Sequence, residues 1–192
     1  MSLPYLMAKW KVLNSTEVVK SGFFRLRHDQ CQLPDGRVMP RYYVMEFVDW
    51  VNVVPITADG QIVMIEQYRH GGGETFLEIP GGSTHGPDED PKIAGARELE
   101  EETGYTSKTW IYCGYHFPNP ALQTNKMHTF LAVDCVKTAE PELDPFEDLS
   151  VHLYPIEEVH RKWEAGEIRH SLISNSLSLA FPRLMKLVKM NS

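Results

Sequence analysis

The sequence contains few cysteines, and none of them lie close together. Its 192 residues include three cysteines, Cys31, Cys113 and Cys135, without a CxxC pair. An odd number of widely spaced cysteines argues against a disulfide framework and gives no zinc-ligand spacing. The cysteine pattern therefore predicts a protein of a reducing compartment, the cytoplasm.

Long hydrophobic runs and an excess of positive charge are also missing. No run of 18 apolar residues occurs, so we expect no membrane span. The N-terminus lacks the charged-then-apolar pattern of a signal peptide. The formal net charge is −7, whereas a protein whose main role is to hold DNA or RNA needs a positive surface. We therefore expect neither a membrane nor a nucleic acid as partner, while small phosphorylated ligands bound through metal ions remain compatible with this charge.

The N-terminal quarter of the chain is rich in residues that favour strands. Residues 10–48 carry aromatic and β-branched side chains, with a turn at Asp35-Gly36. A second hairpin is predicted for residues 50–69, with Asp59-Gly60 in its turn. Because 192 residues suffice for one full domain and a small appendage, we expect an antiparallel β module over 1–48 and a main domain over 49–192.

The rest of the chain alternates strand and helix patterns. Strands are predicted over 110–117, 127–136 and 148–156, the last ending at Pro155. A short helix follows until Gly166, and a C-terminal helix from Ser171 is expected to bend or break near Pro182. Strands first, one helix in the middle and helices at the end predict a mixed α/β layered domain.

The clearest helix covers the stretch AGARELEEETGY, residues 94–105. Asp90 suits the N-cap, Pro91 the first helical position and Gly104 the C-terminal cap. At 100° per residue, the carboxylates of Glu98, Glu101 and Glu102 share one face. Glu100 points away from them.

The neighbours of these glutamates divide the helix into two predicted sides. Ala94 and Gly95 precede them on the same face and leave room beside them. The opposite side is the predicted core face. It consists of Ile93, Ala96, Leu99 and Thr103.

The acidic cluster has two interpretations. Like charges three and four residues apart destabilise a helix by a few tenths of a kcal/mol per pair, and the helix dipole disfavours them near the C-terminus. A solvated acidic face is one interpretation. The other is a site for hard divalent cations, since Mg²⁺ prefers carboxylate and phosphate oxygens. Arg97 can reach Glu101 at i+4 and hold it in place.

The stretch resembles the box of the Nudix family, G-x5-E-x7-R-E-U-x-E-E-x-G-U, where U is apolar. Nine consecutive residues, 97–105, meet its second half. In the first half, six residues rather than five separate Gly82 from Glu89, while Asp88 keeps the regular spacing. We expect a one-residue bulge in the loop before the helix. The resemblance implies the Nudix fold, an α/β/α sandwich with a mixed sheet.

Features outside the box resemble the ADP-ribose and ADP-sugar pyrophosphatases of that family. Residues 66–82 are similar to their strand-loop-strand segment, in which an Arg and a Glu contact substrate; Arg69 and Glu78 occupy these positions. Pro120 lies fifteen residues after Tyr105, a spacing associated with ADP-ribose hydrolases. An N-terminal β module of this size is typical of the group, where it builds a homodimer and lends residues to the partner's site.

Each of these features also has a plainer interpretation. Arg69 fits a surface arginine that ends a strand, Glu78 fits a structural role, and Pro120 fits an ordinary loop proline. Trp50 could stack on adenine, as aromatic side chains do at nucleotide sites, but it also fits a core or interface residue.

A loop after the box supplies a candidate general base, which activates or orients water. Related enzymes often place a Glu there, but residues 119–126 contain none. Glu147, eight residues before Pro155, is similar to the catalytic loop Glu of ADP-sugar hydrolases. Asp148, a box glutamate and a merely solvated acidic loop remain alternatives.

The resemblance implies a Mg²⁺-dependent enzyme, with Mn²⁺ as a possible substitute, that cleaves ADP-ribose or a related nucleotide sugar to a nucleoside monophosphate and a sugar phosphate. The expected metal ligands are Glu98, Glu101, Glu102 and the Gly81 carbonyl. The expected catalytic residues are Glu101 and Glu147, with Arg97 as brace. Alternatives are GDP-mannose, NADH or a dinucleoside polyphosphate as substrate, or a non-catalytic ligand-sensing module.

Overall fold

The computed structural model describes residues 8–191, which divide into two compact units. The first contains the chain up to Phe47 together with Asn119–Asn125, and the second contains Val48–Pro118 and the chain from Lys126 onward. Residues 1–7 of the predicted N-terminal module and residue 192 lie outside the described residues.

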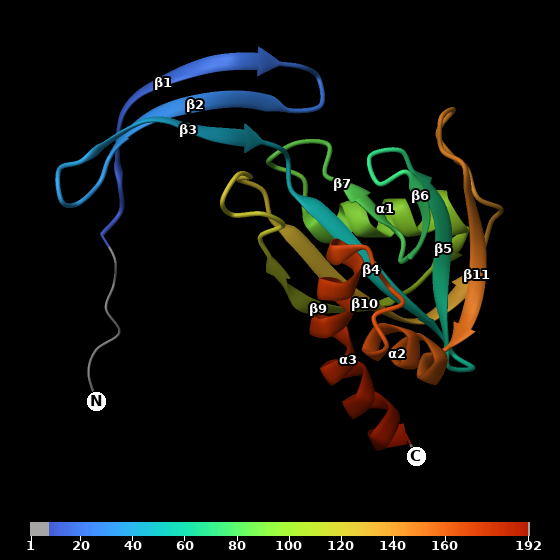
Figure 1. Cartoon of the computed structure of the whole chain (residues 1–192). Coiled ribbons are helices and arrows are strands. Elements are labelled where there is room, and N and C mark those ends of the chain that lie inside the picture. The colour runs from blue at the N-terminus through green and yellow to red at the C-terminus, as the bar shows by residue number, and fades with distance from the viewer. Residues whose placement is uncertain (1–7, 192) are drawn as a thin grey trace, which may run out of the picture. The chain divides into compact units, whose positions relative to one another are not determined.

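The first unit is a three-stranded antiparallel sheet in the order β1-β2-β3 (Figure 1). Its strands are β1 (Lys11–Lys20), β2 (Arg25–Gln32) and β3 (Val38–Glu46). Gly36, with φ at 89°, forms the turn between β2 and β3, and its N–H donates to the Leu33 carbonyl at 3.0 Å. The predicted antiparallel module with its Asp-Gly turn is therefore confirmed.

A segment from the middle of the chain completes the first unit. Met45 of β3 donates to the Leu122 carbonyl at 2.7 Å and accepts from the Thr124 N–H at 3.2 Å. The Tyr42 hydroxyl donates to the Ala121 carbonyl at 2.7 Å. The loop that carries Pro120 thus belongs to the first unit.

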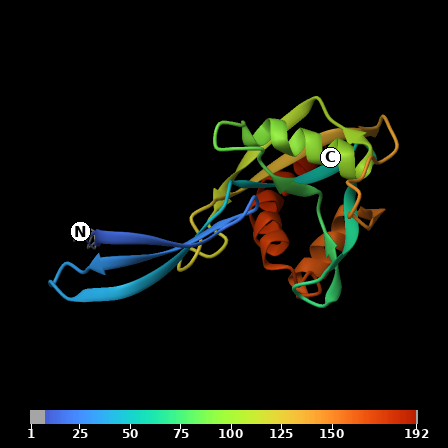
Figure 2. The ribbon, with the colours of Figure 1, turned by 90° about the horizontal axis from the view of Figure 1, so that it is seen from above.

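The second unit is an eight-stranded mixed sheet between helices. Strand β10 pairs with β4 in parallel, whereas the other pairs are antiparallel. Helix α1 lies on one side of the sheet, and α2 and α3 lie on the other (Figure 2). This is the predicted α/β/α sandwich. Its elements are β4 (Trp50–Thr57), β5 (Gln61–Arg69), β6 (Glu74–Glu78), β7 (Gly81–Ser83), α1 (Pro91–Thr103), β8 (Tyr105–Thr106), β9 (Thr109–His116), β10 (Met127–Lys137), β11 (Leu149–Pro155), α2 (Ile156–Glu164) and α3 (Ser171–Asn191).

Strands β4 and β5 separate soon after their turn. Gly60, with φ at 80°, forms the predicted turn, but the two strands pair only at Ile56 and Ile62. Farther on, β7 pairs with β4 and β6 pairs with β5. The link Ile79-Pro80 joins these two short strands and leads the chain from one half of the split sheet to the other.

Helix α1 has the predicted caps. The Asp90 carboxylate accepts from the Lys92 N–H at 2.8 Å, and Pro91 is the first helical residue. Gly104 adopts the left-handed conformation, with φ at 72°, and its N–H donates to the Glu100 carbonyl at 2.8 Å. Both ends of the helix are therefore fixed by local sequence.

The predicted core face of α1 is only partly correct. Ile93 is 63% exposed, whereas Ala94, Gly95 and Leu99 are buried. A Cβ on Gly95 would lie 3.0 Å from a methyl carbon of Val51, so the small residues let the helix approach β4 closely. The sheet-facing side is consequently rotated toward the acidic residues.

The C-terminal helix, predicted to bend or break near Pro182, is not broken there. Helix α3 continues through Pro182 as one element. Ala180, Phe181 and Leu184 around it are buried in the core, and burial on both sides of the proline offsets the lost backbone hydrogen bond. None of the helices in the described residues has the length and apolar character that a bilayer crossing needs.

We expect Gly104→Ala to destabilise the protein more than Gly166→Ala does. Both glycines have φ at 72°, a conformation that costs an alanine about 1–2 kcal/mol. A Cβ at Gly104 would also lie 2.0 Å from the Ala139 carbonyl oxygen, whereas nothing lies within 4 Å at Gly166. Urea unfolding of both variants measures the difference, and equal losses would contradict the close approach at Gly104.

Candidate active site

Helix α1 directs a carboxylate toward the sheet. The Glu102 side chain is buried, and its Oε2 accepts a hydrogen bond from the Gly81 N–H at 2.9 Å. Burial raises the pKa of Glu102 well above its ordinary value; the Gly81 N–H lowers it, while the charges of Glu98 and Glu147 raise it. A buried charge with a single neutral donor is unfavourable, so this position favours a proton or a cation.

Glu98 lies one turn earlier, against the glycine loop. A Cβ on Gly82 would lie 2.4 Å from the Glu98 carboxyl carbon, so only glycine leaves room for that carboxylate. Burial raises the pKa of Glu98, and the charge of Arg97 partly opposes this rise. Two neighbouring carboxylates therefore both resist ionisation in the absence of a cation.

Arg97 joins several of the acidic side chains. Its Nη1 donates to Glu98 at 2.9 Å and to Glu101 at 3.1 Å, and its Nη2 donates to the Ser83 carbonyl at 3.1 Å. Glu89 lies 3.9 Å away despite the extra residue before it. The arginine is thus in the position expected of a brace for the glutamates.

The donor set suits a hard divalent cation. Within residues 8–191, no three histidine, cysteine or acidic side chains converge closely enough to hold a metal ion; instead, Arg97 pairs with Glu98 and Glu101, and Gly81 pairs with Glu102. The carboxylate oxygens of Glu98, Glu101 and Glu102 are nevertheless ligand atoms of the kind that Mg²⁺ prefers. Burial raises the pKa of Glu98 and Glu102, and the positive charge of a bound cation would oppose that rise.

An arginine of β5 stands beside these carboxylates. Arg69 donates through Nε and Nη2 to the two oxygens of Glu78, at 2.9 and 2.7 Å. The hydrogen bond to Glu78 is the largest contribution to the raised pKa of Arg69, and the charges of Glu102 and Glu147 add to it. Glu78 is 1% exposed while the Arg69 side chain is 42% exposed, so the buried Glu78 orients an arginine that remains partly open to solvent.

The loop before β11 brings a further carboxylate to the site. The charge of Glu147 acts on Glu98, Glu102 and Arg69, and its Oε2 accepts from the Asp144 N–H at 3.1 Å. Asp148, the alternative, is exposed. Of the two acids, Glu147 is therefore the one that the structure brings to the carboxylate cluster.

The start of this loop is attached to the end of α1. The N–H groups of Thr138 and Ala139 donate to the Gly104 carbonyl at 2.8 and 3.2 Å, and the N–H of Glu142 donates to the Glu101 carbonyl at 2.8 Å. The carbonyls of Glu101 and of the cap residue Gly104 are thereby satisfied. These hydrogen bonds join the loop to α1 as far as Glu142.

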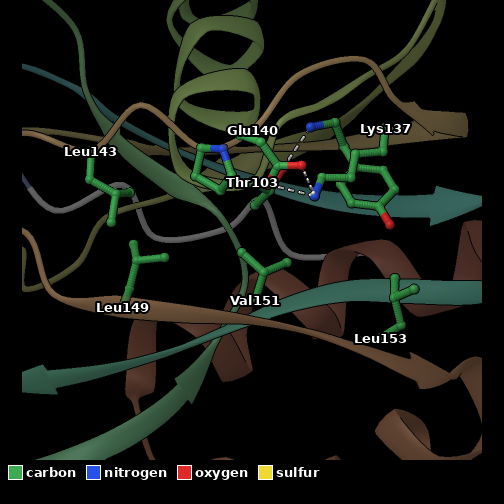
Figure 3. A pocket seen from close by; sticks show the side chains of 9 residues that line it. Thr103, Lys137, Glu140, Leu143, Leu149, Val151 and Leu153 are labelled. Atoms are coloured by element: carbon green, nitrogen blue, oxygen red, sulfur yellow. Dashed lines mark hydrogen bonds and ion pairs between the residues drawn. The ribbon is translucent and has the colours of Figure 1, made fainter.

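A cavity of about 350 Å³ lies between this loop, β11 and the C-terminal end of α1 (Figure 3). Aliphatic side chains form one wall, and Lys137 pairs with Glu140 at 2.9 Å on the other. Its aliphatic residues are Leu143, Leu149, Val151 and Leu153. None of the predicted site residues line it, so it is not the site defined by the glutamates.

Trp50 lies at the start of β4, next to the glycine loop. It is the first residue of β4 and is paired with Ser83 of β7 and Met127 of β10. The residue is half-buried. Trp50 therefore lies beside Ser83, at one end of the glycine loop, whereas Glu78 lies before the other end.

A buried polar network under the glycine loop was not predicted. Asn52 donates to the Ser176 hydroxyl at 2.9 Å, and the Thr129 hydroxyl donates to the same atom at 3.0 Å. A Cβ on Gly81 would lie 2.6 Å from Asn52 Oδ1. This network supports the loop that bonds Glu102. Only the polar Asn52 inside the apolar run WVNVVPIT was a signal for it in the sequence.

Comparison with known protein families identifies the class of protein. Residues 47–174 match the NUDIX domain, and residues 10–44 match the nucleoside diphosphate sugar hydrolase N-terminal domain. The first match covers more than half of the chain. The protein therefore belongs to the NUDIX family.

Individual relatives fit this assignment. The chain is 33% identical over 160 residues to an ADP-ribose pyrophosphatase of Mycobacterium tuberculosis, covering 82% of this chain and 77% of the relative. It is 29% identical over 159 residues to an ADP-ribose pyrophosphatase of Bacillus subtilis, covering 82% and 85%. A methanol dehydrogenase activator of Bacillus methanolicus is 30% identical over 142 residues, covering 72% and 76%.

A solved structure shares the whole fold. The structure titled "Crystal structure of ADP compounds hydrolase" has a TM-score of 0.81 and 23% sequence identity, and the match covers 95% of this chain and 97% of that chain. At this identity the likeness concerns the fold, including the N-terminal sheet.

We expect Glu102→Gln to stabilise the metal-free protein as the pH rises. Because the folded-state pKa of Glu102 is raised, its favourable contribution is complete below the unfolded pKa and is lost as the pH rises through the folded pKa. Thermal unfolding in EDTA between pH 4.5 and 8 should show a Tm advantage of the variant that grows with pH. The exposed Glu100, changed to Gln, is the control, and a variant advantage that shrinks with pH would contradict the buried charge.

Proposed function

We propose that the protein is a divalent-metal-dependent hydrolase that cleaves the diphosphate of ADP-ribose or a related nucleotide sugar. The products are a nucleoside monophosphate and a sugar phosphate. The observation that carries the proposal is the buried, singly bonded Glu102 beside Glu98 at the Gly81–Gly82 loop. The relatives named ADP-ribose pyrophosphatase support the substrate class.

The metal site consists of Glu98, Glu101, Glu102 and the Gly81 carbonyl, with Mg²⁺ as the natural ion and Mn²⁺ as a substitute. A bound cation supplies Lewis-acid chemistry: it neutralises diphosphate charge and acidifies a water. Arg97 keeps Glu98 and Glu101 apart and aligned through its hydrogen bonds to both. Glu101, the most exposed of the three glutamates, also has room to act on a water.

Substrate binding uses residues on both sides of the metal site. Arg69, oriented by the buried Glu78, donates its remaining N–H groups to a phosphate, a role that suits the planar guanidinium. Trp50 provides an aromatic surface for the base at the other end of the glycine loop. In this pair Glu78 positions the Arg69 guanidinium, and Arg69 contacts the phosphate.

Glu147 is the candidate general base. Its charge acts on Glu98, Glu102 and Arg69, which supports this role, and it stands on a loop segment beyond the hydrogen bond of Glu142 to α1. A carboxylate in this position accepts the proton of the attacking water.

The three-stranded sheet supports a homodimer. We assign the N-terminal module to residues 1–48 and the catalytic domain to 49–192, with Asn119–Asn125 joined to the module. Val12, Val18 and Val19 of β1 are each more than 40% exposed. A sheet with apolar side chains so exposed is stabilised by a partner surface. The three free cysteines agree with a cytoplasmic location.

The first test is hydrolysis of a substrate panel with Mg²⁺, using ADP-ribose, ADP-glucose, GDP-mannose, NADH and a dinucleoside polyphosphate. We expect the highest kcat/KM for an ADP-sugar, and a loss of several orders of magnitude in kcat for Glu102→Gln. The matched control Glu100→Gln should retain wild-type activity because its side chain points to solvent. Preference for another class would refute the substrate assignment, and inactivity on all of them would favour a ligand-sensing module.

We expect Glu147→Gln to lower kcat by about 10²–10⁴-fold, the range of a general base, with little change in KM. Asp148→Asn, the neighbouring control, should stay close to wild type. The comparison is made by steady-state kinetics on ADP-ribose between pH 6 and 9. A larger loss for the Asp148 variant would transfer the role to that residue.

A further inference from the structure

Phe146, in the loop before β11, is a large apolar side chain that is fully open to solvent. Its relative exposure is 101%, and contact of an apolar ring of this size with water is unfavourable. Phe146 is a central residue of a turn in which the Glu147 N–H donates to the Asp144 carbonyl at 2.9 Å. The exposed ring is therefore the direct neighbour of the candidate general base, Glu147.

This turn lies between two fixed ends of the loop. On one side the Glu142 N–H donates to the Glu101 carbonyl at 2.8 Å, and on the other side Leu149 begins β11. The hydrogen bonds that hold the turn join Asp144 and Glu147 to each other: besides the backbone bond, Glu147 Oε2 accepts from the Asp144 N–H at 3.1 Å. The turn can consequently change its orientation as a unit without breaking these bonds.

The cavity between this loop, β11 and the end of α1 offers an apolar site for the ring (Figure 3). Leu149, Val151 and Leu153 of β11 line it, and its volume is about 350 Å³. An apolar cavity of about 150 Å³ is sufficient to bind benzene in another protein. The cavity therefore has room for one phenyl ring.

Phe146 is within reach of this cavity. Leu143 and Leu149 both line the cavity, and each is three residues from Phe146. Three residues of chain span at most about 11 Å. A reorientation of the turn between these two residues is therefore enough to bring the ring from solvent to the cavity.

The charge of Glu147 explains why the ring is outside in the absence of a ligand. Like charges repel, and the charge of Glu147 raises the pKa of both Glu98 and Glu102. This repulsion opposes any movement of the turn toward α1. It is relieved when a cation and a substrate occupy the carboxylates, so that burial of the ring then favours the closed loop.

From these observations we propose that Phe146 is a positioning residue: its ring enters the cavity when substrate is bound and holds Glu147 beside the carboxylates of α1. Thr103 lines the cavity and directly follows Glu102, so a ring seated there lies next to the helical turn that carries the expected metal ligands. The inference rests on the proposed function and goes beyond it by assigning a role to the cavity and to Phe146.

Three substitutions test the docking of the ring. Phe146→Ala removes the ring, whereas Phe146→Leu keeps an apolar side chain that fits the cavity. Val151→Phe fills the cavity from its wall and leaves Phe146 in place. Phe23→Ala is the matched control, because Phe23 lies in the turn between β1 and β2 and is 81% exposed.

Steady-state kinetics on ADP-ribose measure the effect on the reaction. We expect Phe146→Ala to lower kcat about tenfold, the lower end of what burial of a phenyl ring contributes to an equilibrium. KM should change little, because the ring does not touch the substrate. Phe146→Leu should recover most of the loss, Val151→Phe should reproduce it, and Phe23→Ala should match wild type.

A double variant shows whether Phe146 acts through Glu147. We expect Phe146→Ala combined with Glu147→Gln to have the same kcat as Glu147→Gln alone, because the ring serves only to place that carboxylate. Losses that multiply in the double variant would overturn the positioning role.

Chymotrypsin, which cleaves after exposed phenylalanines, detects docking without reference to activity. The probe is the α,β-methylene analogue of ADP-ribose, added with Mg²⁺ at concentrations that saturate each protein. We expect the analogue to protect the bond after Phe146 in the wild type and not in Val151→Phe. Equal protection of the two proteins, or none in the wild type, would show that the ring does not enter the cavity.

The failure of this inference differs from failure of the proposed function. An active wild-type protein whose kcat is unchanged in Phe146→Ala would refute the role of Phe146 alone. A wild-type protein that hydrolyses none of the nucleotide sugars would refute the proposed function, and the inference with it.

Discussion

The hydrogen bond from the Gly81 N–H to Glu102 is the interaction on which the site depends. It joins the link between the two halves of the split sheet to the helix that carries the glutamates. It requires glycine at 81, because a Cβ there would lie 2.2 Å from the Val51 carbonyl oxygen. It also requires Gly95, which lets α1 approach β4. Gly81 and Gly95 therefore allow the Glu102 carboxylate to be buried, although burial removes its solvation by water.

The arginines near Glu102 are paired with other carboxylates. Arg97 binds the outer carboxylates of Glu98 and Glu101, and Arg69 is held by Glu78 rather than by Glu102. The innermost carboxylate consequently has no cation as a direct partner. A divalent ion would supply that partner, and a diphosphate would then be held between the ion and the exposed edge of Arg69. Structural stability alone gives no reason to bury a glutamate here.

Local sequence was sufficient for some elements and not for others. The caps of α1 were predictable because Asp90 and Gly104 act on their own helix. Ile93 was misassigned because periodicity defines faces relative to one another, whereas the close contact at Gly95 decides which face meets the sheet. The pairing of Met45 with residues 122–124, the splitting of β4 from β5, and the burial of Glu78 depend on contacts between distant parts of the chain. Helix α3 is continuous because residues on both sides of Pro182 pack into the core. The local rule that proline breaks a helix takes no account of such packing.

On the proposed function, binding of a metal ion removes the proton that burial favours on Glu102. Calorimetric titration of Mg²⁺ at pH 6 in buffers of different ionisation enthalpy measures protons released on binding, since metal ligands must lose their protons. We expect the wild-type protein to release protons, Glu102→Gln to release fewer, and Glu100→Gln to release as many as the wild type. Mg²⁺ binding without proton release, or equal release by the wild type and Glu102→Gln, would contradict it.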